Sequence, residues 1–264
     1  MPSPGRGPGL PDAREFLHRF LETARRRGFE VTRFGSASDG TPLLVATRGP
    51  ENPVLSVCIS AGIHGDEPAG SLALLQWIAS GIPDPGVAWT IFPLLNPTGW
   101  DAGSRENVAG VDLNRDYLRL TQPETAAQVA WWDGRKSRYD WTVCLHEDWE
   151  AKGFYLYEVG RPEMVSIGRA ILRQVDPIIA VETAAEIDGM PAARGLIAPS
   201  GDISQRGPLW PEALRLIRYH APVCHTFETP SGAPLAKRMA AHIAGLRAGL
   251  AEMLRPRLDD DFVI

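Results

Sequence analysis

Hydrophobic and polar positions follow two recurring patterns along this chain, and they predict strands and helices in turn. The clearest strand signal is the apolar, β-branched run at 54–59, which turns through Ala61-Gly62 and leads into an apolar helix that includes residues 72–78. Similar apolar runs predict further buried strands at 87–95, 141–145 and 222–227. Caps and helical spacing of apolar residues predict helices over 13–27, 123–132, 162–175 and 234–254.

Turns and loops separate these elements. Residues 31–49 predict a β-hairpin with Asp39-Gly40 in its turn. Residues 100–120 lack periodicity and predict a long loop, whose polar composition favours a functional role. Residues 186–210 are punctuated by Gly and Pro and predict irregular structure. Strands that alternate with helices predict one α/β domain with a largely parallel sheet.

No repeat or strong linker divides the 264 residues. We expect a loose Pro- and Gly-rich segment at 1–10, one domain at 11–258 and a short acidic tail at 259–264. The cysteines lie inside apolar runs, which predicts buried thiols rather than disulfides; they are Cys58, Cys144 and Cys224.

Charge and hydropathy exclude several classes of partner. The net charge of −5 argues against nucleic acid or an anionic membrane as a partner. The chain has no apolar stretch of about 18 residues, so no transmembrane helix is expected. Its first residues lack the apolar core of a signal peptide, which predicts a cytoplasmic protein. The oligomeric state is left open.

Polar side chains that can carry chemistry follow the predicted strands. His64 and Glu67 follow the first buried strand, and a polar loop at 105–115 follows the second. His146 follows the third strand and Glu228 follows the fourth. Ligands of open α/β sheets bind at the carboxyl ends of the strands, so these side chains predict a pocket at one edge of the sheet.

Two imidazoles and one carboxylate form a typical catalytic zinc set. His64 and Glu67 lie three residues apart on one turn, and His146 supplies the second imidazole. Each has a simpler interpretation on its own, because Glu67 also suits a solvated helix start and His146 a strand end with satisfied hydrogen bonds. Together they predict one Zn²⁺ with a position open to water, and a bound water of this kind is a nucleophile at neutral pH.

The remaining polar residues fit the other steps of a hydrolysis. Glu228 is the candidate general base because it is a carboxylate outside the metal set. Arg105 could stabilise the oxyanion, and Asp112 could orient His64. Arg115, with Asn114 beside it, could hold a substrate carboxylate through a bidentate contact.

These residues together resemble the zinc metallocarboxypeptidase family. The resemblance is carried by His64-Gly65-Asp66-Glu67, Asn96-Pro97-Thr98-Gly99, Asp112-Leu113-Asn114-Arg115, His146 and Glu228. It runs from about residue 34 to the last predicted helix. It implies a single α/β domain with about eight strands in a mixed sheet between helices, one Zn²⁺ and hydrolysis of an amide next to a free carboxylate.

By the same resemblance, the family's roles fall on residues of this chain. His64, Glu67 and His146 match the metal ligands, and Glu228 matches the general base. Asn114 and Arg115 match the carboxylate clamp, and Arg105 matches the oxyanion arginine less closely. The tyrosine that covers the substrate in digestive members has three candidates here, none in a matching context: Tyr155, Tyr157 and Tyr219. A specificity residue could lie among Arg194, Asp202 and Arg206.

Three functions remain open at this point. The first is a carboxypeptidase acting on small peptides, including those derived from cell walls. The second is a deacylase of N-acyl amino acids, as in the related succinylglutamate desuccinylase and aspartoacylase group. Those relatives usually add a carboxy-terminal β domain, whereas this sequence ends in a predicted helix and a short tail, which favours the peptidase. The third is a metal-binding relative without catalysis, against which Glu228 argues.

Overall fold

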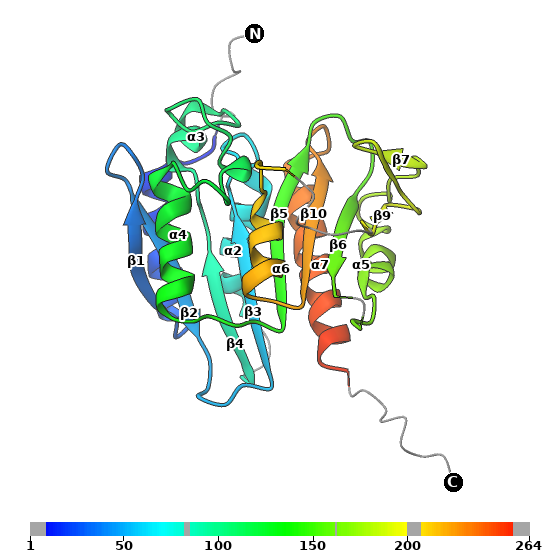
Figure 1. Ribbon diagram of the computed structural model, residues 1–264, viewed down its shortest axis with the longest axis horizontal. Helices are drawn as coiled ribbons and strands as arrows, with labels where there is room; N and C mark the ends of the chain where they lie inside the picture. The colour runs from blue at the N-terminus through cyan, green and yellow to red at the C-terminus, as the bar shows by residue number, and fades with distance from the viewer. Residues whose placement is uncertain (1–8, 82–84, 162, 200–206, 256–264) are drawn as a thin grey trace.

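An eight-stranded sheet runs through the centre of this computed structural model (Figure 1), which describes residues 9–81, 85–161, 163–199 and 207–255. In spatial order, its strands are β1 (Glu30–Ser36), β2 (Pro42–Arg48), β4 (Val87–Phe92), β3 (Leu55–Ala61), β5 (Trp141–Asp148), β10 (Val223–Pro230), β6 (Tyr155–Gly160) and β9 (Leu196–Ile197). The central strands β4, β3, β5 and β10 are parallel to their neighbours in that group. Strand β2 pairs antiparallel with β1 and β4, and β6 pairs antiparallel with β10 but parallel with β9. The predicted fold, a mixed α/β sheet of about eight strands, is confirmed.

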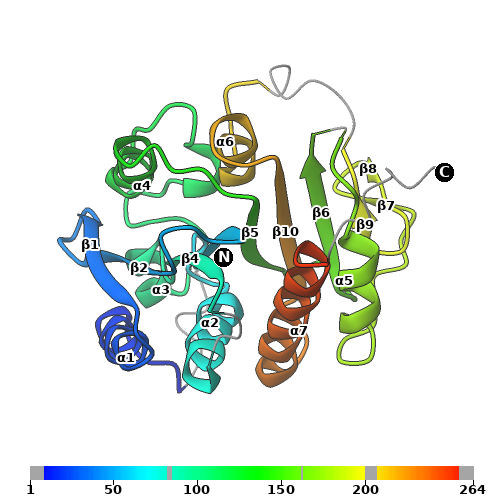
Figure 2. The same ribbon diagram turned by 90° about the horizontal axis from the view of Figure 1, so that it is seen from below.

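Helices cover both faces of this sheet (Figure 2). One face carries α1 (Ala13–Arg26), α2 (Pro68–Ser80), α7 (Leu235–Met253) and α5 (Gly168–Val175). The other carries α4 (Pro123–Gly134) and α6 (Glu212–Tyr219). Each face has its own apolar core, one around Trp77, Trp141 and Phe227 and the other around Phe92 and Trp132. The buried strands are apolar on both sides for this reason.

Local sequence signals explain several boundaries. Asp12 caps α1 by accepting a hydrogen bond from the Glu15 amide. Gly40 takes a positive φ of 84° in the β1–β2 turn, a conformation that glycine adopts without strain. The three cysteines are buried and free, as predicted. No helix in the described ranges is both long and apolar enough to cross a membrane.

The structure corrects three predictions of the sequence analysis. The helix expected at 162–175 begins only at Gly168. The segment expected to be one loop at 100–120 contains the end of α3 (Pro97–Ala102) and a 3-10 turn, η1 (Leu113–Arg115). The region 186–210 contains a small hairpin, β7 (Glu186–Ile187) with β8 (Met190–Pro191), besides β9. Strand β6 and helix α6 had not been predicted. The segments 1–8 and 256–264 lie outside the described residues, so the predicted loose start and acidic tail stay predictions.

Candidate active site

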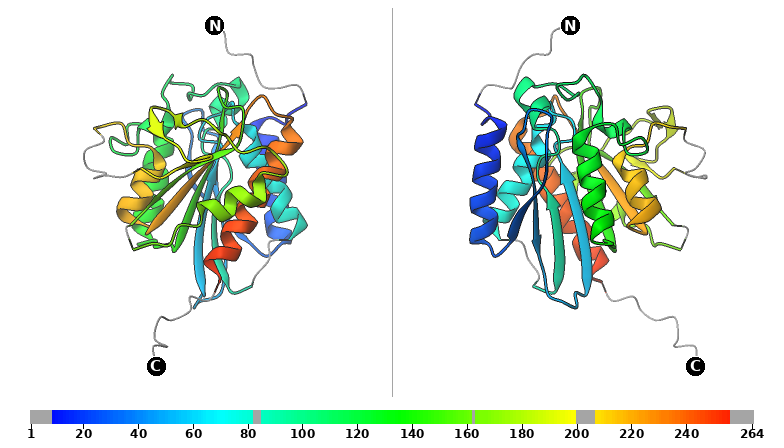
Figure 3. Two further views of the ribbon diagram at one scale, coloured as in Figure 1. Left: turned by 90° about the vertical axis from the view of Figure 1, so that its right-hand side faces the viewer. Right: turned by 60° about the vertical axis from the view of Figure 1, so that its left-hand side comes forward.

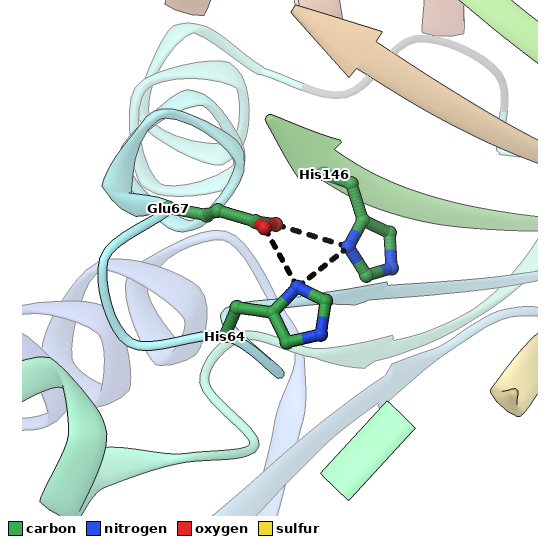
Figure 4. Close-up of side chains that lie close together, drawn as sticks. All are labelled: His64, Glu67 and His146. Atoms are coloured by element: carbon green, nitrogen blue, oxygen red, sulfur yellow. Dashed lines mark hydrogen bonds and ion pairs between the residues drawn. The ribbon is translucent and has the colours of Figure 1, made fainter. Parts of the chain in front are cut away.

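Three buried side chains converge where the parallel strands end (Figure 4). His64 follows β3, Glu67 occupies the N-cap position of α2, and His146 lies in β5. The turn that presents His64 depends on glycine: Gly62 has a φ of 64°, and a Cβ on Gly65 would lie 1.9 Å from the backbone of α3. The chain therefore packs α3 directly against this turn, which fixes His64 (Figure 3 shows α3 at this end of the sheet).

The donor atoms of these three side chains fit a single divalent cation. Nδ1 of His64 and Nδ1 of His146 are 3.3 Å apart, and Glu67 places its oxygens 2.6 Å and 3.0 Å from them. Two nitrogens at a typical zinc distance from one tetrahedral centre would be separated by about 3.3 Å. One ligand atom from each residue lies within 4.8 Å of the others. Two ring nitrogens that face each other need a proton or a cation between them.

Electrostatics favour the ligand forms of Glu67 and His146. Burial raises the pKa of Glu67, but the facing imidazoles outweigh burial and lower it well below its usual range. Burial lowers the pKa of His146, which keeps its ring neutral. For His64, burial lowers the pKa, but Glu67 and Asp112 outweigh it and raise the pKa to about 9. A cation bound here would displace that proton.

Asp112 and Arg105 lie directly behind the His64–Glu67 pair. Asp112 Oδ1 lies 3.2 Å from Nε2 of His64, the ring nitrogen that faces away from Glu67. Arg105 donates to Asp112 through Nε at 3.0 Å, and its Nη1 lies 3.5 Å from Glu67. Burial raises the pKa of Asp112, but the hydrogen bond from His64 and the charge of Arg105 lower it overall. The structure thus brings Asp112 to the position expected for orienting His64, with Arg105 at the edge of the same group.

Glu228 lies on β10 beside the metal-ligand candidates. It is in register with His146 of β5 and with Tyr155 of β6. Burial and then the charge of Glu67 raise its pKa well above the usual range for a carboxyl group. Its carboxylate makes no hydrogen bond or ion pair with the described residues, which leaves its oxygens available to water or substrate.

Asn114 and Arg115 occupy η1 and line the same cavity. Oδ1 of Asn114 accepts a hydrogen bond from the Glu212 amide at 2.9 Å. This contact leaves the Nδ2 amide of Asn114 free to donate toward a ligand. Arg115 is exposed, and its guanidinium donates only to the Asn114 carbonyl, at 2.8 Å, among the described residues. Both side chains can therefore reach a carboxylate.

All eight predicted residues lie in or beside one cavity of about 630 Å³, a volume typical of small-molecule sites. Among the expected substrate-covering tyrosines, Tyr155 and Tyr157 line this cavity and Tyr219 does not. Arg194 is exposed outside the lining, and Asp202 and Arg206 lie outside the described residues.

Sequence reasoning missed Asp148 and Asp188, the hydrogen-bond partners of the two tyrosines that line the cavity, and it missed Trp149 on the cavity wall. Tyr155 donates a hydrogen bond to Asp148 at 2.9 Å, and Tyr157 donates to Asp188 at 2.5 Å. Trp149 stands at the wall with 80% of its surface exposed. Two signals could have found part of this wall: Asp188-Gly189 is a hairpin-turn dipeptide, and the tyrosines alternate with apolar residues as in a strand.

Comparisons with known proteins agree with this arrangement. Residues 53–173 match the model of the succinylglutamate desuccinylase/aspartoacylase catalytic domain. Carboxypeptidase SOL1 of Arabidopsis thaliana is 37% identical over an alignment of 105 positions, which includes 32% of this chain. That alignment covers only 21% of the plant protein, so most of its length has no counterpart in the match.

Solved structures share the fold over nearly the whole chain. A protein from Shewanella amazonensis, provisionally described as a metallopeptidase, superposes with a TM-score of 0.79 at 24% identity, covering 92% of this chain and 93% of its own. The carboxypeptidase A of Helicoverpa armigera gives 0.69 at 14%, covering 92% and 73%. A metallo-carboxypeptidase from Burkholderia cenocepacia gives 0.67 at 19%, covering 90% and 68%. At these identities the likeness is one of fold. With the sequence matches, it confirms the resemblance to the zinc carboxypeptidase-like family.

Proposed function

Because this chain has the metallocarboxypeptidase fold and matches a catalytic-domain model of metal-dependent relatives, we propose that it is a zinc-dependent amidohydrolase. Its preferred substrate is a small peptide, from which it releases the carboxy-terminal residue. The observation that carries this proposal is the convergence of His64, Glu67 and His146, with Glu228, in one cavity. A structural metal site would need no additional carboxylate beside it.

Different residues of the chain bind the substrate and the metal ion in this reaction. Asn114 and Arg115 bind the terminal carboxylate and so place the scissile amide near the metal-ligand group. His64, Glu67 and His146 would hold Zn²⁺, which would supply the Lewis acidity to activate water and polarise the amide carbonyl.

Proton transfer and charge stabilisation fall to two other side chains. Glu228 takes the proton of the attacking water and passes it to the departing amine, which requires its carboxylate form at the start of the reaction. Burial and the charge of Glu67 raise the pKa of Glu228, so its ionised carboxylate would be a stronger base than an exposed one, and a cation bound nearby would favour that ionised form. Arg105 lies 3.5 Å from Glu67, at the edge of the metal-ligand group, and is in place to stabilise negative charge on the substrate oxygen.

Charges on the cavity wall favour a peptide over an N-acylated acidic amino acid. Arg105 and Arg115 line the cavity from the segment between α3 and the end of η1, whereas Asp148, Glu150 and Asp188 line it from the end of β5, the turn after it and the β7–β8 hairpin. None of these three carboxylates forms an ion pair with a described cation. A substrate with one carboxylate at the arginines and a positive group at the acidic wall suits this distribution, and a second substrate carboxylate there would be repelled.

Deacylation of an N-acyl amino acid is the second candidate, and the family match over residues 53–173 is the observation that favours it. The two activities use the same metal site and the same base. They differ in what lies beyond the scissile amide: an amino-acid residue in the peptide, and a simple acyl group in the deacylase substrate.

The first experiment measures zinc per chain by elemental analysis in the wild type, in His146→Ala and in a control, His220→Ala. His220 is also buried but lies outside the cavity lining. We expect about one zinc in the wild type and the control and a large loss in H146A. A wild type that takes up no Zn²⁺ would overturn both candidate functions.

A substrate panel then separates the candidates. Dipeptides and tripeptides with neutral, basic and acidic side chains are compared with N-acetyl-aspartate and N-succinyl-glutamate, by detection of the released amine. Faster release from peptides, with basic ones ahead of acidic ones, is the expected result. Release only from the N-acyl amino acids would replace the peptidase proposal with the deacylase.

A further inference from the structure

The N-terminus of helix α2 is not capped by its own N-cap side chain. Glu67 occupies its N-cap position, but the Glu67 side chain makes no capping hydrogen bond, because its carboxylate faces His64 and His146. The first amides of a helix need acceptors, and the N-cap side chain normally supplies one. At α2 this acceptor has to come from another element.

Glu147 of β5 supplies that acceptor. Its Oε1 accepts a hydrogen bond from the Ala69 amide at 2.7 Å, in the first turn of α2. Its own amide donates to Oε2 of Glu67 at 3.1 Å. The carboxylate also suits the positive end of the helix dipole. One residue thus holds α2 through its side chain and the carboxylate of Glu67 through its backbone.

Arg238 in the first turn of α7 completes the contact. Its Nη1 donates to Oε2 of Glu147, and its Nε donates to the Ala233 carbonyl at 2.9 Å. A cation is unfavourable at a helix N-terminus, so its position in α7 calls for a nearby anion. The Glu147 side chain is fully buried and supplies that anion. Helices α2 and α7 lie side by side on the same face of the sheet (Figure 2).

The first turn of α2 also packs closely against the end of β5, so the two elements cannot shift relative to each other at this point. A Cβ on Gly70, in the first turn of α2, would lie 2.7 Å from the Cβ of Leu145 on β5. Glu147 follows Leu145 and His146 on the same strand. The Gly70–Leu145 contact and the Glu147–Ala69 hydrogen bond therefore hold the start of α2 against the end of β5. Both elements carry a metal-ligand candidate, Glu67 on α2 and His146 on β5.

We propose that Glu147, held by Arg238, is the positioning residue that fixes Glu67 and His146 at the separation a single metal ion requires. The inference rests on the proposed zinc site. Both oxygens of Glu147 accept hydrogen bonds, one from Ala69 and one from Arg238. In Glu147→Gln, the amide NH₂ must therefore face a donor, so even this isosteric change breaks one contact. The start of α2 then loosens, and Glu67 is no longer held at its distance from His146.

Zinc affinity of the metal-free protein, measured by competition with a chromophoric chelator, tests this role. We expect E147Q to bind Zn²⁺ roughly 10–100-fold more weakly than the wild type, the usual effect of removing a group that orients metal ligands. Arg238→Met keeps Glu147 but removes its partner, and we expect a loss of about tenfold. Should E147Q fail to fold, R238M decides the question alone.

Glu158→Gln is the matched control. Glu158 is also a largely buried carboxylate that accepts from the first amides of a helix, Ile167 and Gly168, and from a side-chain N–H group, that of His225. It lies outside the cavity lining. We expect E158Q to lose thermal stability but to bind zinc within about threefold of the wild type.

The outcomes separate the two proposals. Wild-type affinity in folded E147Q or R238M overturns the positioning role and leaves the zinc site intact. An equal loss of affinity in E147Q and E158Q also overturns it, because the effect is then one of general destabilisation. A wild type without zinc binding overturns the metal site itself and this inference with it.

Discussion

Replacing Glu158 by glutamine should destabilise the protein in a pH-dependent way, without touching the candidate active site. Oε2 of Glu158 accepts hydrogen bonds from the Ile167 amide at 3.0 Å, the Gly168 amide at 2.7 Å and Nε2 of His225 at 2.9 Å. Trp141 donates to Nδ1 of His225 at 2.9 Å, which places the ring proton on Nε2, facing Glu158. The carboxylate therefore accepts from three N–H groups.

The magnitude follows from the pKa of Glu158. Burial raises this pKa, but the hydrogen bonds from His225 and from the start of α5 outweigh burial and lower it from 4.5 to about 2. At about 1.4 kcal/mol per pKa unit, the ionised form stabilises the folded state by roughly 3 kcal/mol. Only 10% of the side chain is exposed, so solvent screening reduces this figure little. Glutamine is isosteric with the protonated acid and should cost about the same amount at pH 7.

The sign of the pH dependence is fixed by the lowered pKa. A carboxyl group whose pKa is lower in the folded state contributes its full stability above the unfolded pKa, and loses it as the pH falls through the folded value. The gap in unfolding free energy between the wild type and Glu158→Gln should therefore shrink by roughly 1 kcal/mol at pH 4 and 2 kcal/mol at pH 3.

Urea unfolding of both proteins at pH 7, 5, 4 and 3, followed by circular dichroism, measures this gap. A gap that stays constant from pH 7 to pH 3 would show that the variant lost packing rather than a charge-dependent contact. No destabilisation at pH 7 would refute the reasoning from the lowered pKa of Glu158.

Three further predictions concern the candidate active site. Glu228→Gln should keep its zinc but lower kcat by about 10²–10⁴-fold, and an unchanged kcat would remove Glu228 from the role of general base. Arg115→Met should raise KM for peptides by about 10–100-fold, because the charged contact with the substrate carboxylate is lost. Arg119→Met, at an exposed arginine outside the cavity lining, should leave KM unchanged. Equal effects of the two variants on KM would exclude Arg115 from binding the substrate carboxylate. Gly65→Ala places a Cβ 1.9 Å from the backbone of α3 and should lower the free energy of unfolding, measured with urea, by about 3 kcal/mol or more. In the control Gly134→Ala, the added Cβ meets no atom within 4 Å. Similar stability of the two variants would contradict the close packing of Gly65 against α3.

The central strands could be predicted because they are buried on both faces. The run at 54–59 is largely apolar, and in the structure all of it except the exposed Val54 lies between two apolar cores as part of β3. Strand β6 escaped prediction because its exposed end and its polar residues break the apolar run: Tyr157 and Glu158 face the cavity and α5 rather than a core. Polar residues that make tertiary contacts interrupt the apolar pattern of a strand, so hydrophobic periodicity alone does not identify that strand.

The late start of α5 has a tertiary cause as well. Spacing of apolar residues extended the predicted helix back to residue 162, but the amides of Ile167 and Gly168 donate to Glu158 on a different element. A carboxylate nine residues earlier in the chain thus provides the cap and sets the first turn. Nothing within the helix sequence itself marks this position.

Residues with a chemical role at the candidate site, and Asp112 beside them, could be found from the sequence, whereas Glu147, for which we propose a positioning role, could not. His64, Glu67 and His146 stand out because an imidazole–carboxylate pair and a strand-end imidazole are typical ligand types, and the structure brings them to one point. Glu147 is next to His146 in the sequence, but its contacts with Ala69 and Arg238 join segments about 80 and 90 residues away in the chain. Such a role depends on how three elements pack together, and it becomes visible only when the fold brings the end of β5 to the starts of α2 and α7.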